Sequence, residues 1–271
     1  MPGQHRRGPY VVADPYEGVS PDGTIRTGAR RDRVPDIFEP VLHDAMELLD
    51  DSGASLYVYG SVATGDARPG SSDVDLLSID LPGAARTGEQ LSATYADRCR
   101  GVEVADTAAA DYLGETDAAY GNRVFLRHYC VHLAGPDPSV ALPSFPADAR
   151  AARGFNGDLD RHHERWRREL ATGAASSHDL AVRAARKTLL ATAGLVSVHD
   201  HTWTTDRARA SRRWGEIEPH LAVPLGLLQS WSDGWRTPAR GELEEVLGPD
   251  GVVATVVACF AGIIGLWAEQ P

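Results

Sequence analysis

A short window, residues 57–79 (YVYGSVATGDARPGSSDVDLLSI), constrains this chain more than any other part of its sequence. Its first residues favour a strand over residues 56–59 that ends at Gly60. Gly60 has no side chain to obstruct a ligand, and Ser61 begins a predicted helical turn whose free N–H groups form an anion cradle. A loop containing Pro and Gly follows, and a second strand begins at Asp73. The window therefore predicts strand, anion-binding turn, loop and strand.

Two carboxylates, Asp73 and Asp75, stand at the start of the second strand. Side chains two apart on a strand share a face, so we expect both carboxylates on one side and Val74 on the other. Neighbouring carboxylates repel each other unless a cation neutralises them, and Mg²⁺ prefers carboxylate oxygens and substrate phosphates. Such a pair beside an anion cradle is typical of two-metal in-line phosphoryl or nucleotidyl transfer.

A third carboxylate is expected from a neighbouring strand, and Glu103 is the candidate. Val102 and Val104 flank it, and burial of both valines requires Glu103 to point away from the core. Asp106 is the competitor, but it has the opposite strand parity and cannot face the same way as Glu103.

The pattern Gly60-Ser61, eleven intervening residues, Asp73-Val74-Asp75 and a later strand carboxylate resembles the DNA polymerase β-like nucleotidyltransferase superfamily. Within it, the chain looks most like the bacterial aminoglycoside adenylyltransferases. The likeness covers about residues 36–137 and includes the GVEV strand and the turn at 132–137. It implies that Asp73 and Asp75 hold Mg²⁺, as two ions, and the nucleoside triphosphate. Glu103 would be a third ligand or the base that takes the acceptor's proton.

Periodicity divides the rest of the chain into two parts. A helix over 36–51, strands over 56–59, 73–79, 101–105 and 129–133, and a helix over 88–99 indicate a compact unit. Helical patterns dominate after residue 150, with segments at 158–171, 177–193, 205–214, 220–233, 241–247 and 252–268.

The predicted fold class is therefore α+β. An irregular N-terminal arm (1–34) precedes a nucleotidyltransferase catalytic domain with a small mixed sheet flanked by helices (35–145). An all-helical bundle that binds the acceptor (150–271) follows, after a linker at 143–157.

Two cations of the helical part resemble phosphate-binding residues of the same adenylyltransferases. Arg207 takes the position of a lysine that reaches the phosphates, and this departure keeps the charge but changes its shape. Lys187 is a second candidate. The resemblance therefore gives Gly60, Ser61, Lys187 and Arg207 as the predicted nucleotide-binding residues.

Composition limits the partners and the compartment. The 271-residue chain has a net charge of -11 and a pI of about 5.3, which disfavours nucleic acid and suits a cationic acceptor such as an amino sugar. Three cysteines, with no metal-ligand spacing, favour a reducing cytoplasm. The uncharged stretch 252–267 is shorter than the ~20 apolar residues of a membrane span, so we expect a buried C-terminal helix.

The expected activity is transfer of a nucleoside monophosphate, AMP from ATP or the equivalent from another NTP, to a hydroxyl of a small-molecule acceptor. Two alternatives stay open: nucleotidylation of tRNA or protein, and a non-catalytic nucleotide-binding protein of the same fold. The sequence predicts no oligomeric state.

Overall fold

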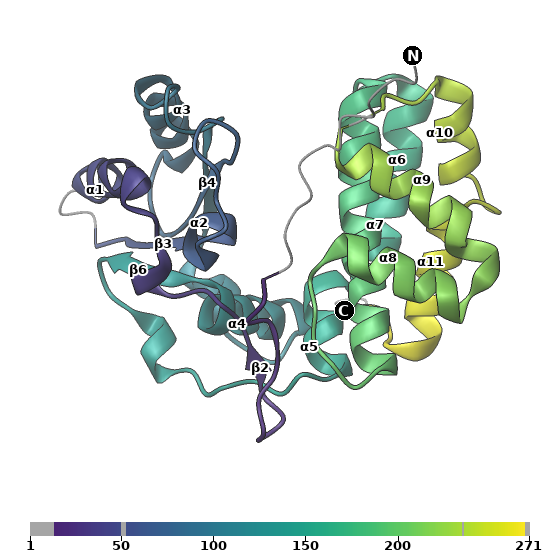
Figure 1. Cartoon of the computed structure of the whole chain (residues 1–271), viewed down its shortest axis with the longest axis horizontal. Coiled ribbons are helices and arrows are strands. Elements are labelled where there is room, and N and C mark those ends of the chain that lie inside the picture. The colour runs from purple at the N-terminus through teal and green to yellow at the C-terminus, as the bar shows by residue number, and fades with distance from the viewer. Residues whose placement is uncertain (1–13, 50–52, 235, 269–271) are drawn as a thin grey trace, which may run out of the picture. The chain divides into compact units, whose positions relative to one another are not determined.

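A computed structural model of the chain describes residues 14–49, 53–234 and 236–268. The chain divides into two compact units (Figure 1): one spans Asp14–Pro146, and the described part of the other begins at Ala147. The first unit contains both strands and helices. Its elements are β1 (Gly18–Val19), β2 (Ile25–Arg26), η1 (Arg31–Arg33), η2 (Asp36–Phe38), α1 (Glu39–Glu47), β3 (Ser55–Tyr59), α2 (Gly60–Thr64), β4 (Val74–Ile79), α3 (Ala84–Thr94), β5 (Val102–Thr107), η4 (Ala109–Tyr112), α4 (Asp117–Tyr129), β6 (Val131–Ala134) and η5 (Pro138–Ala141).

A four-stranded mixed sheet in the order β5-β4-β3-β6 forms the centre of the first unit. β3 pairs antiparallel with β4 and with β6, whereas β4 and β5 run parallel. A parallel pair needs a crossover connection, and α3 supplies it between β4 and β5. The predicted mixed sheet with flanking helices is confirmed.

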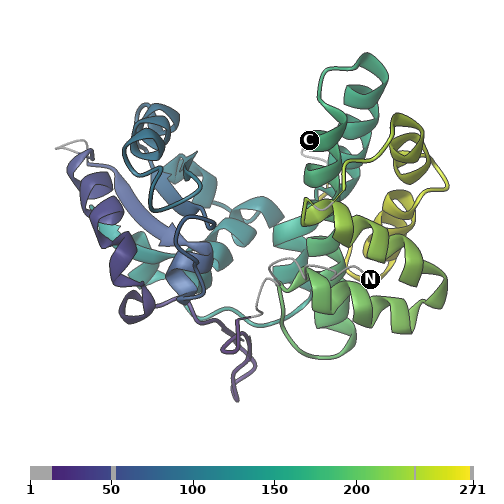
Figure 2. The same ribbon diagram turned by 45° about the horizontal axis from the view of Figure 1, so that its top comes forward.

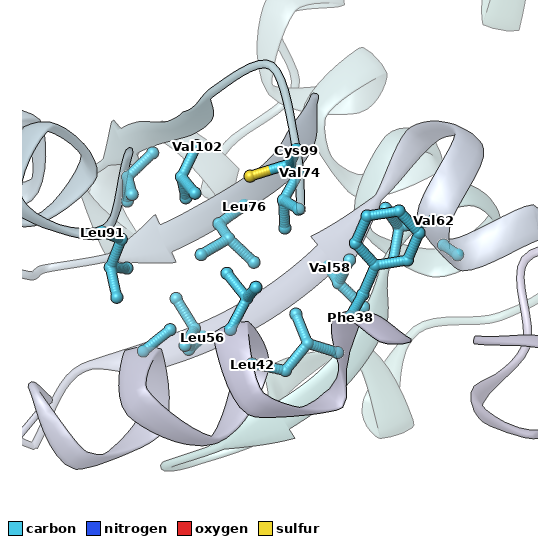
Figure 3. Close-up of a cluster of buried hydrophobic side chains, with 14 of the residues drawn as sticks. Phe38, Leu42, Leu56, Val58, Val62, Val74, Leu76, Leu91, Cys99 and Val102 are labelled. Carbon is cyan, nitrogen blue, oxygen red and sulfur yellow. The ribbon is translucent and has the colours of Figure 1, made fainter. Parts of the chain in front are cut away.

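Each face of this sheet carries its own apolar cluster. Val58, Val74, Leu76 and Val102 point to one face, where Figure 3 shows them between helices and strands. They pack there with side chains of α1, α2 and α3, including Phe38 just before α1. Tyr57, Leu77 and Ile79 point to the other face and pack with Leu126 of α4. Alternation of the strand side chains thus separates a mainly apolar face, which carries the polar pair Ser78 and Asp106, from a second face that is apolar at one end of β4 and acidic at the other.

The four predicted strands are confirmed with end shifts of up to two residues. Helix α4 was not predicted: the sequence DAAYGNRVFLRHY contains Gly121 and several β-formers, but the Thr116 side chain caps its first turn. Residues 14–34, expected to be irregular, include the β1–β2 pair and belong to the first unit. Arg33 holds this segment together, since it lies over the Tyr16 ring and donates to the Gly28 carbonyl. The expectation for residues 1–13 lies outside the described residues.

The described part of the second unit contains helices and no named strand. They are α5 (Ala149–Asn156), α6 (Leu159–Thr172), α7 (Ser177–His199), α8 (Arg207–Ile217), η6 (Pro219–Leu221), α9 (Ala222–Ser232), α10 (Arg240–Leu247) and α11 (Val252–Ile263). Helix α7 contacts α5, α6, α8, α9 and α11, and Figure 2 shows this group of teal, green and yellow helices from a second side. Its buried alanines and Gly194 explain the close contacts, because small side chains let neighbouring helices approach.

Two expectations for this unit need correction. The predicted linker at 143–157 contains α5, which is capped by the Asp148 carboxylate and buries Ala151 and Ala152. The C-terminal helix ends at Ile263 rather than 268.

The segment Arg240–Ile263 passes a test of length and apolarity for a membrane span, with 39% of its most apolar window buried. Val253, Val256 and Phe260 are buried, whereas Ala258 and Ala261 are exposed. The expected buried helix is therefore buried on one side only.

Candidate active site

Strand register places three polar side chains of the sheet in one row. Asp75 of β4 pairs with Tyr59 of β3 on one side and with Glu103 of β5 on the other. Paired residues of adjacent strands project to the same face, so Tyr59, Asp75 and Glu103 are neighbours across three strands. Burial raises the pKa of Tyr59 above its usual range, and the charges of Asp75 and Glu103 raise it further. The raised pKa of Tyr59 thus agrees with the strand register, which places Asp75 and Glu103 on the same face as Tyr59.

The third strand of the row shows the expected alternation. Val102 and Val104 are buried while Glu103 is exposed. Asp106, the competing carboxylate, pairs in register with Ser78 and accepts a 3.0 Å hydrogen bond from the Ser78 hydroxyl. Because Ser78 belongs to the Val74 face of β4, Asp106 faces away from Asp75.

Gly60 brings the backbone against the Asp75 carboxylate. Its φ is +67°, a left-handed conformation that favours glycine. A Cβ at this position would lie closer than 3.0 Å to Oδ2 of Asp75, which real Cβ atoms do not do. Helix α2 follows directly, and the partly buried Ser61 is its second residue. The predicted turn and the predicted Asp75 ligand are therefore adjacent.

Asp73 is arranged differently from Asp75. It lies just before β4, and the Arg100 guanidinium binds both of its carboxylate oxygens: Nε lies 2.9 Å from Oδ1, and Nη2 contacts Oδ2. Among the described residues, the three predicted ligands Asp73, Asp75 and Glu103 do not bring one oxygen each within 4.8 Å of one another. Asp75 and Glu103 are thus neighbours on adjacent strands, whereas Asp73 is bound by Arg100, and the convergence of all three carboxylates on a metal stays a prediction.

Three other side chains of the described residues do bring one possible ligand atom each within 4.8 Å of one another. His43, Asp44 and Glu47 lie on one side of α1 and could each offer a ligand atom to a metal ion. His43 and Glu47 are exposed, and Asp44 accepts a 2.5 Å hydrogen bond from the Tyr95 hydroxyl. Exposed acidic groups at this helical spacing are common without a metal, so the trio is not assigned a function.

The two predicted cations of the second unit differ in their surroundings. Lys187 forms a 2.8 Å ion pair with Asp158 and donates to the Phe155 carbonyl. Burial raises the pKa of Asp158, but the His162 hydrogen bond and the Lys187 charge outweigh it and bring this pKa to about 2. Lys187 therefore has a structural partner.

Arg207 begins α8, and its pKa is lowered first by burial and then by the nearby charge of Arg186. The charges of Asp233 and Asp206 act in the opposite direction, so Arg207 has both a cation and carboxylates around it, and its role toward phosphate stays a prediction.

A pocket of about 390 Å³ lies beside α8. Its polar lining comprises Thr202, Asp200, Glu216 and three arginines, Arg209, Arg212 and Arg213. Arg213 binds both Asp200 oxygens and Glu216. Within the described part of the chain no ion pair involves Arg209 or Arg212, so the pocket has a net positive character.

Two site residues were not anticipated from the sequence. Tyr59 could have been found, because it is the last residue of the strand preceding Gly60. No sequence pattern around Arg100 indicated its role, because its contact with Asp73 depends on the parallel pairing of β4 and β5.

One of two comparisons with known proteins found a match, and it covers the part of the chain that holds most of these residues. No curated protein matched the sequence. Residues 43–92 match the family model of a nucleotidyltransferase domain, and this stretch includes Gly60, Ser61, Asp73 and Asp75 but ends before Glu103. The β3–β4 region with its acidic end is thus similar to a nucleotidyltransferase domain, and this likeness supports an enzyme that transfers nucleotides.

Proposed function

We propose that this chain transfers a nucleoside monophosphate, AMP from ATP in the first instance, to a hydroxyl of a small-molecule acceptor such as an aminoglycoside or a natural-product intermediate. Pyrophosphate is the second product. The observation that carries this proposal is the row formed by Asp75 and Glu103 beside Gly60, of which Gly60 and Asp75 lie within the stretch that matches a nucleotidyltransferase domain. The reducing cytoplasm is the proposed compartment.

The donor set at this site fits magnesium. Asp73, Asp75 and Glu103 offer carboxylate oxygens, which are the ligands that Mg²⁺ prefers, and neither sulfur nor imidazole belongs to the row. In this proposal Asp73 and Asp75 would hold the metal, as two ions, together with the triphosphate, and Glu103 is left to act on the acceptor. When bound, Mg²⁺ would neutralise phosphate charge and lower the pKa of the attacking hydroxyl.

The chain's own groups have separate tasks in this reaction. The acceptor oxygen forms a bond to the α-phosphorus while the bond from that phosphorus to the α,β-bridging oxygen breaks, and pyrophosphate leaves with the electron pair. The N–H groups of the Gly60-Ser61 turn bind phosphate oxygens. Glu103, which is exposed, takes the proton of the acceptor hydroxyl.

In this proposal the second unit contributes acceptor selection and phosphate contacts. Arg207 is the candidate of this unit for phosphate binding, as the resemblance implies, whereas Lys187 is engaged by Asp158. The arginine-lined pocket beside α8 favours a second candidate function, nucleotidylation of an anionic acceptor such as tRNA.

The test is incubation with Mg²⁺, each NTP labelled at the α-phosphate, and separate panels of aminoglycosides and tRNA. We expect label transfer to one acceptor class, reduced about 10²–10⁴-fold in Asp75→Asn and Glu103→Gln. Asp106→Asn is the matched control, because Asp106 faces away from the row, and it should keep its activity. Nucleotide binding without transfer to any acceptor would instead support a non-catalytic protein, and full activity of Asp75→Asn would refute the site.

A further inference from the structure

Arg100 is the cation that neutralises Asp73 in this structure. Its guanidinium engages both carboxylate oxygens, which is the two-point geometry that makes Arg–carboxylate pairs strong and directional. The hydrogen bond and the charge of Asp73 raise the pKa of Arg100, and Asp75 adds a smaller effect of the same sign. Arg100 thus belongs electrostatically to both predicted magnesium ligands.

The backbone holds Arg100 in this place. The N–H of Arg100 donates to the Ser72 carbonyl at 3.0 Å, and the N–H of Val74 donates to the Gly101 carbonyl at 2.9 Å. These bonds extend the parallel β4–β5 ladder past the start of both strands, so the Arg100 backbone is fixed beside Asp73. The contact is therefore built into the sheet and is not a chance meeting of two loops.

The side chain of Arg100, in contrast, is able to leave. It is 60% exposed, against 27% for Asp73. An exposed guanidinium regains water when it swings away, and this hydration offsets part of the cost of breaking the pair. The Asp73 carboxylate would then be open to another cation, whereas both of its oxygens are engaged while Arg100 is bound.

We propose that Arg100 is a built-in competitor for the metal position, and that a divalent cation binds Asp73 only after displacing the Arg100 side chain. This inference rests on the proposed function, because it assumes that Asp73 and Asp75 are metal ligands. It adds a residue that sets the metal affinity of the site. Loss of Arg100 is expected to tighten metal binding, which is the opposite of what removal of a ligand does.

The probe is Mn²⁺ alone, with free Mn²⁺ measured by electron paramagnetic resonance in titrations of the full chain. Arg100→Gln removes the competitor and should bind Mn²⁺ about three- to tenfold more tightly than the wild type. Arg100→Lys keeps the charge but loses the two-point contact, so its affinity should fall between the two. Arg98→Gln is the matched control: it removes one charge two residues away, where Arg98 lies over the Tyr95 ring, and should bind like the wild type.

The outcomes separate this inference from the proposed function. Unchanged or weaker Mn²⁺ binding in Arg100→Gln, with binding abolished in Asp75→Asn, overturns the competitor role and keeps the metal site. Equal tightening in Arg98→Gln and Arg100→Gln overturns it as well, because general charge would then explain the effect. Full Mn²⁺ binding by Asp75→Asn, or no binding by any variant, overturns the metal site and the inference together.

Discussion

Gly60→Ala tests whether the glycine turn and Asp75 work as one unit. The new Cβ would meet Oδ2 of Asp75 inside 3.0 Å, and the residue would also have to keep a left-handed conformation at φ +67°. An L-residue in that conformation costs about 1–2 kcal/mol. The clash itself adds little to the loss of stability, because the carboxylate is the mobile end of a side chain and can rotate away. Its consequence falls on the site, where Asp75 would point in a new direction.

Gly83 provides the matched control. It has φ +80°, and a Cβ added there would meet no atom within 4 Å, so Gly83→Ala introduces the same strain without a clash. We expect both variants to lose about 1–2 kcal/mol of unfolding free energy in urea titrations. Only Gly60→Ala should also weaken Mn²⁺ binding, by about 10–100-fold, as expected when the orientation of a ligand is lost.

Two outcomes would contradict the predicted link between Gly60 and Asp75. If Gly60→Ala bound Mn²⁺ as tightly as Gly83→Ala, the close approach of Gly60 to Asp75 would have no role in the site. If both variants lost Mn²⁺ binding equally, general destabilisation would explain the loss.

Two further predictions concern stability. Burial, followed by the Arg127 charge, lowers the pKa of His128 to about 4, and its Nε2 accepts from the Phe145 N–H at 2.9 Å. The unfolded chain therefore binds more protons between pH 6.5 and 4, so the unfolding free energy should fall by about 1–2 kcal/mol as the pH drops through that window. Urea titrations at several pH values measure this fall, and an equal fall in His128→Gln would contradict the assignment. Lys187→Met removes the 2.8 Å ion-pair partner of the Asp158 charge and leaves it with the His162 hydrogen bond, so it should cost about 3 kcal/mol by thermal unfolding. Arg183→Met, on the same helix as Lys187, breaks an exposed pair with Glu169 of α6 and should cost under about 1 kcal/mol; equal losses would show that the Lys187 pair is a surface pair too.

Local patterns were sufficient for the strands and for most helices. Alternation in GVEVA gave both the strand and the side on which Glu103 lies, because burial of two valines leaves one choice. Local patterns did not predict helix α4. Its residue Leu126 packs on the sheet, and a helix with Gly121 and β-forming residues has no strong local preference.

Pairings between distant residues could not be predicted. The sequence offered Lys187 and Arg207 as similar cations, and nothing near either one showed that Asp158, far away in the sequence, engages Lys187. Arg100 is the same case, since its neighbour Asp73 is set by the order and direction of the strands. Side-chain type and parity were thus readable from the sequence, whereas the partner of each charge depended on the tertiary structure.

The row across the sheet also bears on which group accepts the proton in the proposed reaction. Tyr59 is next to Asp75, but burial and the two carboxylates raise its pKa, so it remains a neutral phenol throughout the neutral range. A neutral phenol can donate a hydrogen bond to Asp75 or to a phosphate but cannot take a proton from a hydroxyl. Asp75, held against Gly60, is placed to bind the cation. Glu103 is then the exposed member of the row and is left to take the proton of the acceptor hydroxyl, so cation binding and proton transfer fall to different residues of the row.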